Sequence, residues 1–523
     1  MLRIRTTKLS SHNTAVQVVH RHHHKTDIVK HIGTARDEKD LNELKELADQ
    51  YIKTNSAIPP LLPDAFGRND TDDLVSLKHL QFTASFHAFA YEFLSFFYEH
   101  NGFNKIACDL LKDLSFIRLI EPTSKFHSVE LLKEYFHITY PINRIYEELA
   151  GIRLFKEQVE KAAISYAKEH LGFDFSLVFY DVTTLYFETF KEDEDSQDDT
   201  GAMTKEGLRK NGFGKERKPG QPQIVIGLVV NSHGYPISVQ IFPGKTFEGH
   251  TMLPVIKGLQ KAHGIKTLTI VADAAMLSLA NTKAIKEAEL SYIVGARMGS
   301  ISVKLLADIS GKLGKTEGKY IRIKTDWGIL ICDYSEKRAA KDRTDRKKQL
   351  LKAQYQIDNP DKVKRRTRFV AEETKATLTL NQELIKQDEL REGVKGYYTN
   401  LKRVSSRLIV KRYHDLWHVE KAFRIAKSDL EARPIFHHKR ESIETHILIV
   451  FTSLCIAKSI ELKTGYSLKK VRDMIWRILD IELVDTLTNR KWIKRMDTTG
   501  DEMAGLLTQL TNVDKTKKRV LKK

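Results

Sequence analysis

Two acidic residues lie where strongly apolar stretches of the sequence end. Asp181 ends the apolar part of the run FDFSLVFYDVTTLYFET, and Asp273 ends the run TLTIVAD. Both runs are typical of buried β-strands, where a carboxylate is costly unless it is paired or bound to a metal ion. If the two strands are neighbours in a sheet, the carboxylates converge. For either aspartate alone, a turn former or helix cap is the simpler interpretation.

A third acid, Glu420, lies in the stretch YHDLWHVEKAFRIAK, residues 413–427. This stretch is typical of part of one long amphipathic helix. Tyr413, Glu420 and Lys427 are spaced seven apart, which is nearly two helical turns, so they project from one stripe. If this stripe served only for apolar packing, an acidic and a basic residue on it would be unusual. We therefore expect this helix to pack across the sheet and bring Glu420 to the two aspartates.

Asp181, Asp273 and Glu420 together would form an oxygen-only site, which suits Mg²⁺ or Mn²⁺. Two such ions, about 3.5–4 Å apart, can activate an attacking oxygen and stabilise a leaving one, as in-line attack on a phosphodiester requires. We therefore expect these three residues to be both catalytic and metal-binding. Lys427 would hold a phosphate near the site, and Tyr413 would orient the backbone or a water molecule. Both residues are therefore expected to bind and position DNA.

The charge of the chain favours a polyanionic partner. The 523 residues carry a formal net charge of +18, with a sequence pI near 9.4. Nucleic acid is the first candidate and an anionic membrane surface the second, and a generally soluble basic protein is the alternative. The apolar segment from His446 to Ile460 is too short to span a bilayer and is expected to be a core helix. The three cysteines form no CxxC pair, so reduced thiols in a cytoplasmic protein are expected.

The length predicts two to four domains, and changes in hydrophobic period along the chain place their boundaries. Strands and helices alternate on both sides of the acids, which is typical of an α/β layer. A basic stretch from Glu336 to Arg368, with thirteen Lys or Arg against five Asp or Glu, interrupts this alternation. The predicted segments are a small β/α element over 1–60, a mainly helical domain over 61–172, the first part of the catalytic domain over 173–297, an insertion over 298–400, the second part of the catalytic domain with the helix of Glu420 over 401–460, and C-terminal helices with a basic tail over 461–523. For the helical domain, DNA binding and a scaffold or dimerisation role are equally open.

The order of elements, the long gap between the second and third acids and the Y…E…K spacing resemble the DDE transposases of bacterial insertion sequences. One subgroup has the signature Tyr, two residues, Arg, three residues, Glu, six residues, Lys. This chain matches at Tyr413, Glu420 and Lys427 but has Leu416 at the arginine position, so Arg412 or Arg424 would have to replace that phosphate contact. The resemblance covers roughly residues 173–460. It implies an RNase H-like catalytic core with a β-rich insertion before the final glutamate.

The resemblance also implies a function. It predicts cut-and-paste DNA transfer with Mg²⁺, recognition of double-stranded DNA at terminal inverted repeats and in the target, and a homodimer or higher multimer assembled on DNA. The expected location is the bacterial cytoplasm, at the nucleoid and not at a membrane. The alternatives are an RNase H-like nuclease or resolvase without strand transfer, and a non-catalytic DNA-binding derivative.

Several further residues are weaker candidates. Trp327, in the insertion, could stack on a displaced base, although a core tryptophan is the simpler interpretation. Trp417 is expected to pack its helix, and the RHHHK patch from Arg21 to Lys25 to be a solvated basic turn and not a metal site. The remaining candidates for contact with the site or the scissile phosphate are Thr183, Thr184, Arg433, His437 and His446.

Overall fold

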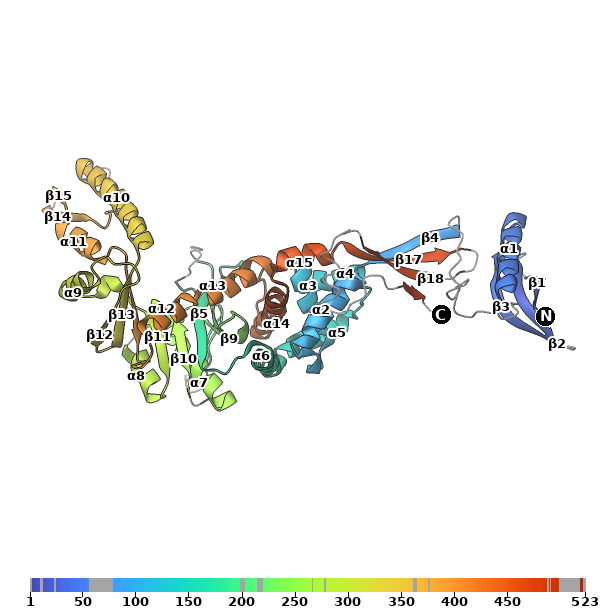
Figure 1. Ribbon diagram of the computed structural model, residues 1–523, viewed down its shortest axis with the longest axis horizontal. Helices are drawn as coiled ribbons and strands as arrows, with labels where there is room; N and C mark the ends of the chain where they lie inside the picture. The colour runs from blue at the N-terminus through green and yellow to red at the C-terminus, as the bar shows by residue number, and fades with distance from the viewer. Residues whose placement is uncertain are drawn as a thin grey trace. The chain divides into compact units, whose positions relative to one another are not determined.

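The chain forms two compact units in the computed structural model (Figure 1). One unit comprises Met1–Phe96, Val129–Thr139 and Lys469–Lys523, and the other Phe97–Ser128 and Tyr140–Leu468. The structure describes residues 2–9, 13–22, 25–55, 79–197, 203–213, 220–265, 267–276, 279–360, 365–374, 377–486, 489, 491–497 and 518–520. The proline-rich connector at 57–67, the centre of the RHHHK patch and most of the basic tail lie outside the described residues.

The smaller unit contains a three-stranded antiparallel sheet of order β1-β2-β3. Its strands are β1 (Leu2–Lys8), β2 (Thr14–His22) and β3 (Lys25–Ala35), and helix α1 (Glu38–Asn55) follows. Leu44 and Ala48 are buried against Val16, Val18 and Ile32. Because the apolar residues of the helix recur at helical spacing, one face of α1 covers the sheet.

A second sheet in this unit corrects the expectation of purely helical C-terminal residues. Helix α15 (Leu468–Ile475) is followed by β17 (Ile478–Asp485), β18 (Lys491–Asp497) and β19 (Lys518–Val520). These strands join β4 (Leu80–Phe86) in the antiparallel order β19-β18-β17-β4. The region expected to contain only helices and a basic tail therefore forms strands from Ile478 onward. Its partner β4 lies almost 400 residues upstream, so the local pattern alone did not reveal the pairing.

The larger unit is built on an eight-stranded sheet of order β12-β13-β16-β11-β10-β5-β8-β9. Strand β5 pairs in parallel with β10 on one side and antiparallel with β8 on the other, and β10 pairs in parallel with β11. Five strands of this sheet lie within residues 173–297, and they are β5 (Leu177–Tyr186), β8 (Gln223–Val230), β9 (Pro236–Pro243), β10 (Thr269–Ala272) and β11 (Ser291–Gly295). Helices α7 (Met252–His263) and α8 (Leu279–Glu287) form the crossovers that parallel strands require.

A long buried helix supports this sheet. Helix α14 (Arg440–Thr464) contacts β9 and helices α3 (Asp109–Ile120), α5 (Ile142–Gly151) and α6 (Lys156–Leu171). Among the described residues it is the one helix long and apolar enough to cross a membrane, and 94% of its most apolar window is buried inside the protein. It is thus a core helix. These helices belong to the same compact unit as the sheet. The limits of the two units fall within helices α2 (Ala88–His100) and α4 (Lys125–Phe136).

The segment expected to be an insertion extends the same sheet. Strands β12 (Tyr320–Thr325), β13 (Gly328–Tyr334) and β16 (Val394–Thr399) add to it beyond β11, with β16 pairing directly with β11 and β13. Between β11 and β16 the chain also forms α9 (Val303–Leu313), α10 (Glu336–Asp358), the hairpin β14 (Val370–Thr374) and β15 (Thr377–Leu380), and α11 (Gln382–Arg391). The segment is therefore a mixed α/β addition to the large sheet, and β14 and β15 form a separate two-stranded sheet within it.

The stretch from Tyr413 to Lys427 is not one regular helix, which corrects that expectation. Helix α12 (Ser406–His414) and helix α13 (Trp417–Arg424) are followed by a π-helical turn, Ile425–Asp429. Between α12 and α13 the backbone bonds tighten to three-residue spacing, for example from the amide of Leu416 to the carbonyl of Tyr413 over 3.1 Å. The turn after α13 widens to five-residue spacing, from the amide of Leu430 to the carbonyl of Ile425. Residue spacing therefore does not by itself fix which side chains share a face here.

Candidate active site

The register between β5 and β10 brings two acidic residues side by side. Ala272, the last residue of β10, is the partner of Tyr180 on β5. Asp273 and Asp181 are the next residues along each parallel strand, and adjacent strands lie about 4.8 Å apart. The sequence placed Asp181 at a strand end, but it lies in the middle of β5, where it pairs with Leu228 on β8. Strand β5 continues along β8 after β10 has ended, so Asp181 faces space that β10 no longer fills.

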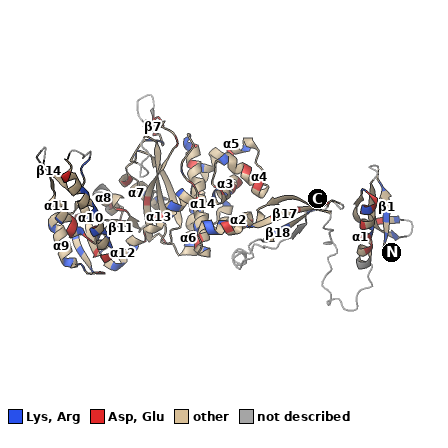
Figure 2. Ribbon diagram, turned by 90° about the horizontal axis from the view of Figure 1, so that it is seen from above, with Lys and Arg blue, Asp and Glu red and all other residues tan. Residues whose placement is uncertain are grey.

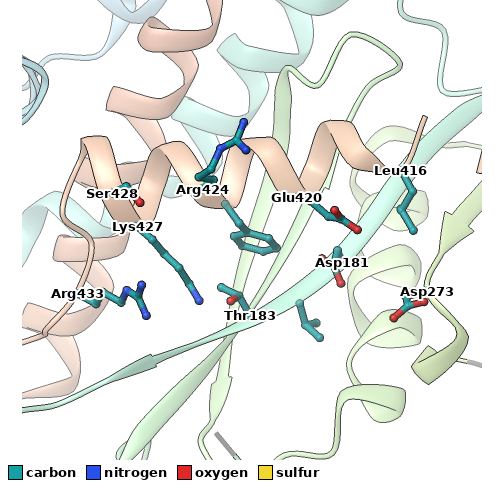
Figure 3. A pocket seen from close by; sticks show the side chains of 11 residues that line it. Asp181, Thr183, Asp273, Leu416, Glu420, Arg424, Lys427, Ser428 and Arg433 are labelled. Atoms are coloured by element: carbon teal, nitrogen blue, oxygen red, sulfur yellow. The ribbon is translucent and has the colours of Figure 1, made fainter. Parts of the chain in front are cut away.

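Helix α13 places Glu420 over the same space. The helix contacts β5 and β8 and buries Val419, Ala422 and Phe423, while Glu420 stays exposed. A cavity of about 440 Å³ is lined by all three acids (Figure 3). Its full lining is Asp181, Val182, Thr183, Asp273, Leu416, Glu420, Phe423, Arg424, Lys427, Ser428 and Arg433. Three carboxylates that are far apart in sequence thus share one solvent-accessible cavity.

Tyr413 fixes the orientation of one of these acids. Its hydroxyl donates a hydrogen bond to Oδ1 of Asp273 over 3.3 Å, and the amide of Ala274 donates to the same oxygen over 2.6 Å. The ring is buried and lies 4.8 Å from that of Tyr397. Burial, and then the negative charge of Asp273, raise the pKa of Tyr413 far above its usual value, so the hydroxyl remains a donor at neutral pH.

Gly295 on β11 makes room for this tyrosine. A Cβ atom at position 295 would lie 2.5 Å from the hydroxyl oxygen of Tyr413. That is closer than non-bonded atoms approach, so a side chain there would push the tyrosine away from Asp273. The sequence analysis did not identify Gly295, because a glycine at the end of a strand carries no local signal of what it faces.

Lys395 is a second residue that the sequence analysis missed. Its Nζ lies 4.7 Å from the ring centroid of Tyr413 and 5.7 Å from that of Tyr397, within the range of cation–π contacts. Burial, and then the nearby Arg338, lower the pKa of Lys395, whereas Asp273 and Glu420 act in the opposite direction. The alternation of β16 would have placed Lys395 and Tyr397 on one face, but it could not show that this face meets Tyr413.

Basic side chains line the cavity away from Asp273. Lys427 and Arg433 lie on one side of Thr183, and Asp273 on the other (Figure 3). Arg424 also lines the cavity and projects from α13 on another side than Lys427. An acidic end beside a basic end suits a substrate whose phosphate group must be held while a neighbouring bond reacts.

The segment that carries Arg433 is held from behind by buried polar groups. The guanidinium of Arg118 on α3 donates to the carbonyls of Leu430 and Glu431, over 3.3 and 3.4 Å. These carbonyls directly follow the π-helical turn that carries Lys427. Because buried carbonyls require partners, Arg118 stabilises this segment in the observed position.

Lys125, His437 and His446 form a second buried cluster behind the same segment. Nε2 of His446 donates to the carbonyl of Ala432 over 3.0 Å, so its Nδ1 accepts from Nζ of Lys125, also over 3.0 Å. Nζ of Lys125 also contacts Nε2 of His437. Burial lowers the pKa of Lys125 and of His446 well below their usual values, and lowers that of His437 to about 3. Both histidines are therefore neutral at neutral pH.

The structure separates the sequence candidates. Arg424, Lys427, Arg433 and Thr183 line the cavity with the three acids, and Leu416 lies there with its side chain buried. The other candidates lie elsewhere. His437 and His446 belong to the buried cluster, Thr184 is buried in β5, and Arg412 is not part of the lining.

Neither tryptophan lines the cavity. Trp327 lies in the turn between β12 and β13, where its carbonyl accepts a hydrogen bond from the hydroxyl of Tyr292 and its ring lies 6.3 Å from that of Tyr398. Trp417 was expected to pack its helix, but it is 49% exposed and stacks on His418, with ring centroids 4.0 Å apart.

The carboxylates fit a hard divalent cation by their chemistry. All three donors are oxygens, which Mg²⁺ and Mn²⁺ prefer over nitrogen or sulfur. In the described part of the chain, however, no group of three or more acidic, histidine or cysteine side chains is arranged to hold a metal ion as it stands. Coordination by all three acids would therefore require rotation of the exposed Glu420 side chain.

Comparison with known proteins gives a family match over the residues of this site. The family model described as a transposase DDE domain matches residues 173–456, which is more than half of the chain. No curated protein matches the sequence.

Solved structures with detectable similarity include a piggyBac transposase synaptic complex with hairpin DNA, at 11% identity over 75% of this chain and 70% of that chain, with a TM-score of 0.35. A Mos1 transposase paired-end complex with the left transposon end shows 16% identity over 38% and 57%, with a TM-score of 0.15. A Mos1 mariner paired-end complex with Mn shows 14% identity over 48% and 67%, also with a TM-score of 0.15. These scores are low, so the assignment rests on the family match.

Proposed function

We propose, from the premise that the chain belongs to the family of transposases with a DDE domain and is a DNA transposase, that Asp181, Asp273 and Glu420 are its catalytic carboxylates. One observation carries the proposal. The parallel register of β5 and β10 sets the two aspartates side by side, and α13 places the glutamate over the cavity that both aspartates line. All three residues lie within the matched range 173–456.

The three carboxylates would bind Mg²⁺, or Mn²⁺ in its place, as a pair of ions. When bound, the ions would lower the pKa of the attacking hydroxyl and neutralise charge on the leaving oxygen. The chain's own residues orient the reacting groups. Tyr413 holds Asp273 in one orientation, and Lys427, Arg433 and Arg424 hold the phosphate beside the acids. Such preorganised charges contribute to the rate because they need no rearrangement during the reaction.

The strand order supports an RNase H-like core. The strands β9, β8, β5, β10 and β11 are consecutive in the sheet, the first three antiparallel and the last three parallel. In this proposal β12, β13 and β16 are an addition that leaves the order of the core strands intact. The additional strands enter the chain between the second and third acids, as in the subgroup of insertion-sequence transposases with the Y…E…K signature.

The proposed reaction has two steps. A water molecule cleaves the DNA at the end of the element, and the freed 3′-hydroxyl then attacks target DNA, so that one phosphodiester bond is exchanged for another. The substrates would be terminal inverted repeats and a target duplex, bound by a homodimer or higher multimer in a bacterial cytoplasm at the nucleoid. The net charge of +18 supports binding to DNA.

Strand cleavage of a duplex from the flanks of the gene tests the proposal. With Mg²⁺, the wild-type protein should give cleaved and joined products, whereas Asp181→Asn and Glu420→Gln should abolish both. Asp415→Asn is the matched control, because Asp415 lies between Tyr413 and Glu420 in sequence but lines a different cavity. Full activity of either site variant would refute the site. Cleavage without joined product would instead favour a nuclease.

A further inference from the structure

One side of helix α10 carries a row of exposed lysines. The helix spans Glu336–Asp358 and is 23 residues long. At 3.6 residues per turn, Lys337, Lys341, Lys348 and Lys352 fall within about 60° of one another around the helix axis. We call these four residues the lysine stripe. All four are exposed, and the basic residues of α10 are blue in Figure 2.

The opposite side of α10 is packed and neutralised. Ala339 and Ala353 are buried there. Arg346 contacts Glu392 and lies 3.8 Å from Asp388, while Arg343 pairs with the same Glu392 over 2.9 Å. The paired arginines thus hold α10 against α11 and the residues that precede β16.

The lysine stripe differs from these arginines in its ion pairing. Among the described residues, no acidic side chain lies within ion-pair distance of any of the four lysines. Asp342 is turned to the packed side, where it accepts a hydrogen bond from the amide of Gly393 over 2.9 Å. Asp345 and Asp358 are the acids nearest to the stripe by helical position, and they leave it with an excess of positive charge.

We infer that the lysine stripe of α10 binds the phosphate backbone of duplex DNA without regard to sequence. Lysine contacts phosphate as a point charge, and the stripe contains none of the Arg, Asn or Gln residues that read base edges in pairs of hydrogen bonds. From Lys337 to Lys352 the helix rises by about 22 Å. That length covers more than half of one turn of duplex, which is about 34–36 Å.

The exposed apolar side chains beside the stripe are compatible with this partner. Leu351 is 65% exposed and Tyr355 is 58% exposed, and both lie on the same side of α10 as the lysines. Together with the lysine stems they could contact sugars between the phosphates. The inference rests on the proposed function in one respect only, because that function identifies DNA as the expected polyanionic partner.

Equilibrium binding without divalent metal tests the inference independently of catalysis. The full-length protein would be titrated onto a fluorescent duplex of random sequence in EDTA, at several salt concentrations. Substituting all four lysines by glutamine should make the slope of log K against log salt shallower by about 3 to 4, since each phosphate contact contributes about 0.9. Glutamine and lysine have similar helix propensities, so α10 should remain folded.

Two further variants keep this test decisive. A quadruple Lys→Gln control at Lys257, Lys261, Lys283 and Lys304 makes the same charge change on exposed positions of α7, α8 and α9, and should leave the slope within about 1 of wild type. Lys→Arg at the four stripe positions should retain the wild-type slope.

An unchanged slope in the glutamine stripe variant, or an equal loss in the control, would overturn the inference. A loss confined to duplexes that contain the element end would overturn its independence of sequence. If the wild type binds DNA but never cleaves it, the proposed function fails while the inference stands.

Discussion

The hydroxyl of Tyr413 and the carboxylate of Asp273 are 3.3 Å apart, although 140 residues separate them in the sequence. Tyr413 lies in the last turn of helix α12, and Asp273 directly follows the last residue of strand β10. The hydrogen bond therefore ties the helix that leads into Glu420 to the strand that presents the second acid. Because the tyrosine is buried and cannot turn to solvent, it fixes Asp273 without blocking the cavity.

Tyr413→Phe should reduce the apparent affinity for the metal more than the affinity for DNA. Removing a partner that orients a metal ligand typically costs about 10- to 100-fold in metal affinity. Cleavage rates measured over a range of Mg²⁺ concentrations should recover partly at high Mg²⁺. DNA binding in EDTA should match the wild type, and equal loss of both would show that the variant is misfolded.

Gly295→Ala should resemble Tyr413→Phe, because the added methyl group would displace the tyrosine hydroxyl. We expect about a tenfold loss of cleavage at limiting Mg²⁺. Gly311→Ala on α9 is the matched control, since a Cβ atom there meets nothing within 4 Å. The double variant Gly295→Ala/Tyr413→Phe should be little worse than either single variant. Additive losses would show that Gly295 does not act through Tyr413.

Arg118→Met should slow cleavage without weakening DNA binding in proportion. The substitution removes the donor to the carbonyls of Leu430 and Glu431, and leaving the buried carbonyl of Leu430 without this partner costs about 1–3 kcal/mol. Hydrogen exchange of the segment from residue 430 to 438 should become faster, while that of β5 should not. If exchange is unchanged, Arg118 does not position this segment.

Lowering the pH should reduce the stability of the protein, because His437 binds a proton more readily in the unfolded state. Burial lowers the pKa of His437 to about 3, whereas in the unfolded chain it is near 6.5. The unfolded state therefore binds the proton first, and stability falls as the pH drops below 6.5. At pH 5.5 the loss from this residue should be about 1 kcal/mol. Denaturant unfolding at pH 7.5 and 5.5 would measure it, and His437→Gln should show a smaller difference between the two pH values than the wild type.

Several secondary-structure elements of this protein could be predicted from the sequence, because they depend on local patterns of apolar residues. The apolar runs before Asp181 and Asp273 predicted strands, and both strands are present. The apolar spacing around Glu420 predicted a helix that packs with Val419 and Phe423 inside, and α13 buries both residues. The run from His446 to Ile460 predicted a core helix, which α14 is. Burial of apolar side chains at regular spacing determines each of these features within a few turns or residues.

Other parts were decided only by the tertiary structure. The pairing of Ala272 with Tyr180 sets Asp273 beside Asp181, and no local pattern specifies a register between strands almost a hundred residues apart. Gly295 and Lys395 meet Tyr413 only because β11 and β16 are neighbours in the sheet. The tightened backbone after Tyr413 and the wide turn at Lys427 were likewise visible only in the structure. The sequence thus determined which residues could do the chemistry, and long-range strand pairing decided how they meet, because contacts across a sheet depend on register and not on spacing along the chain.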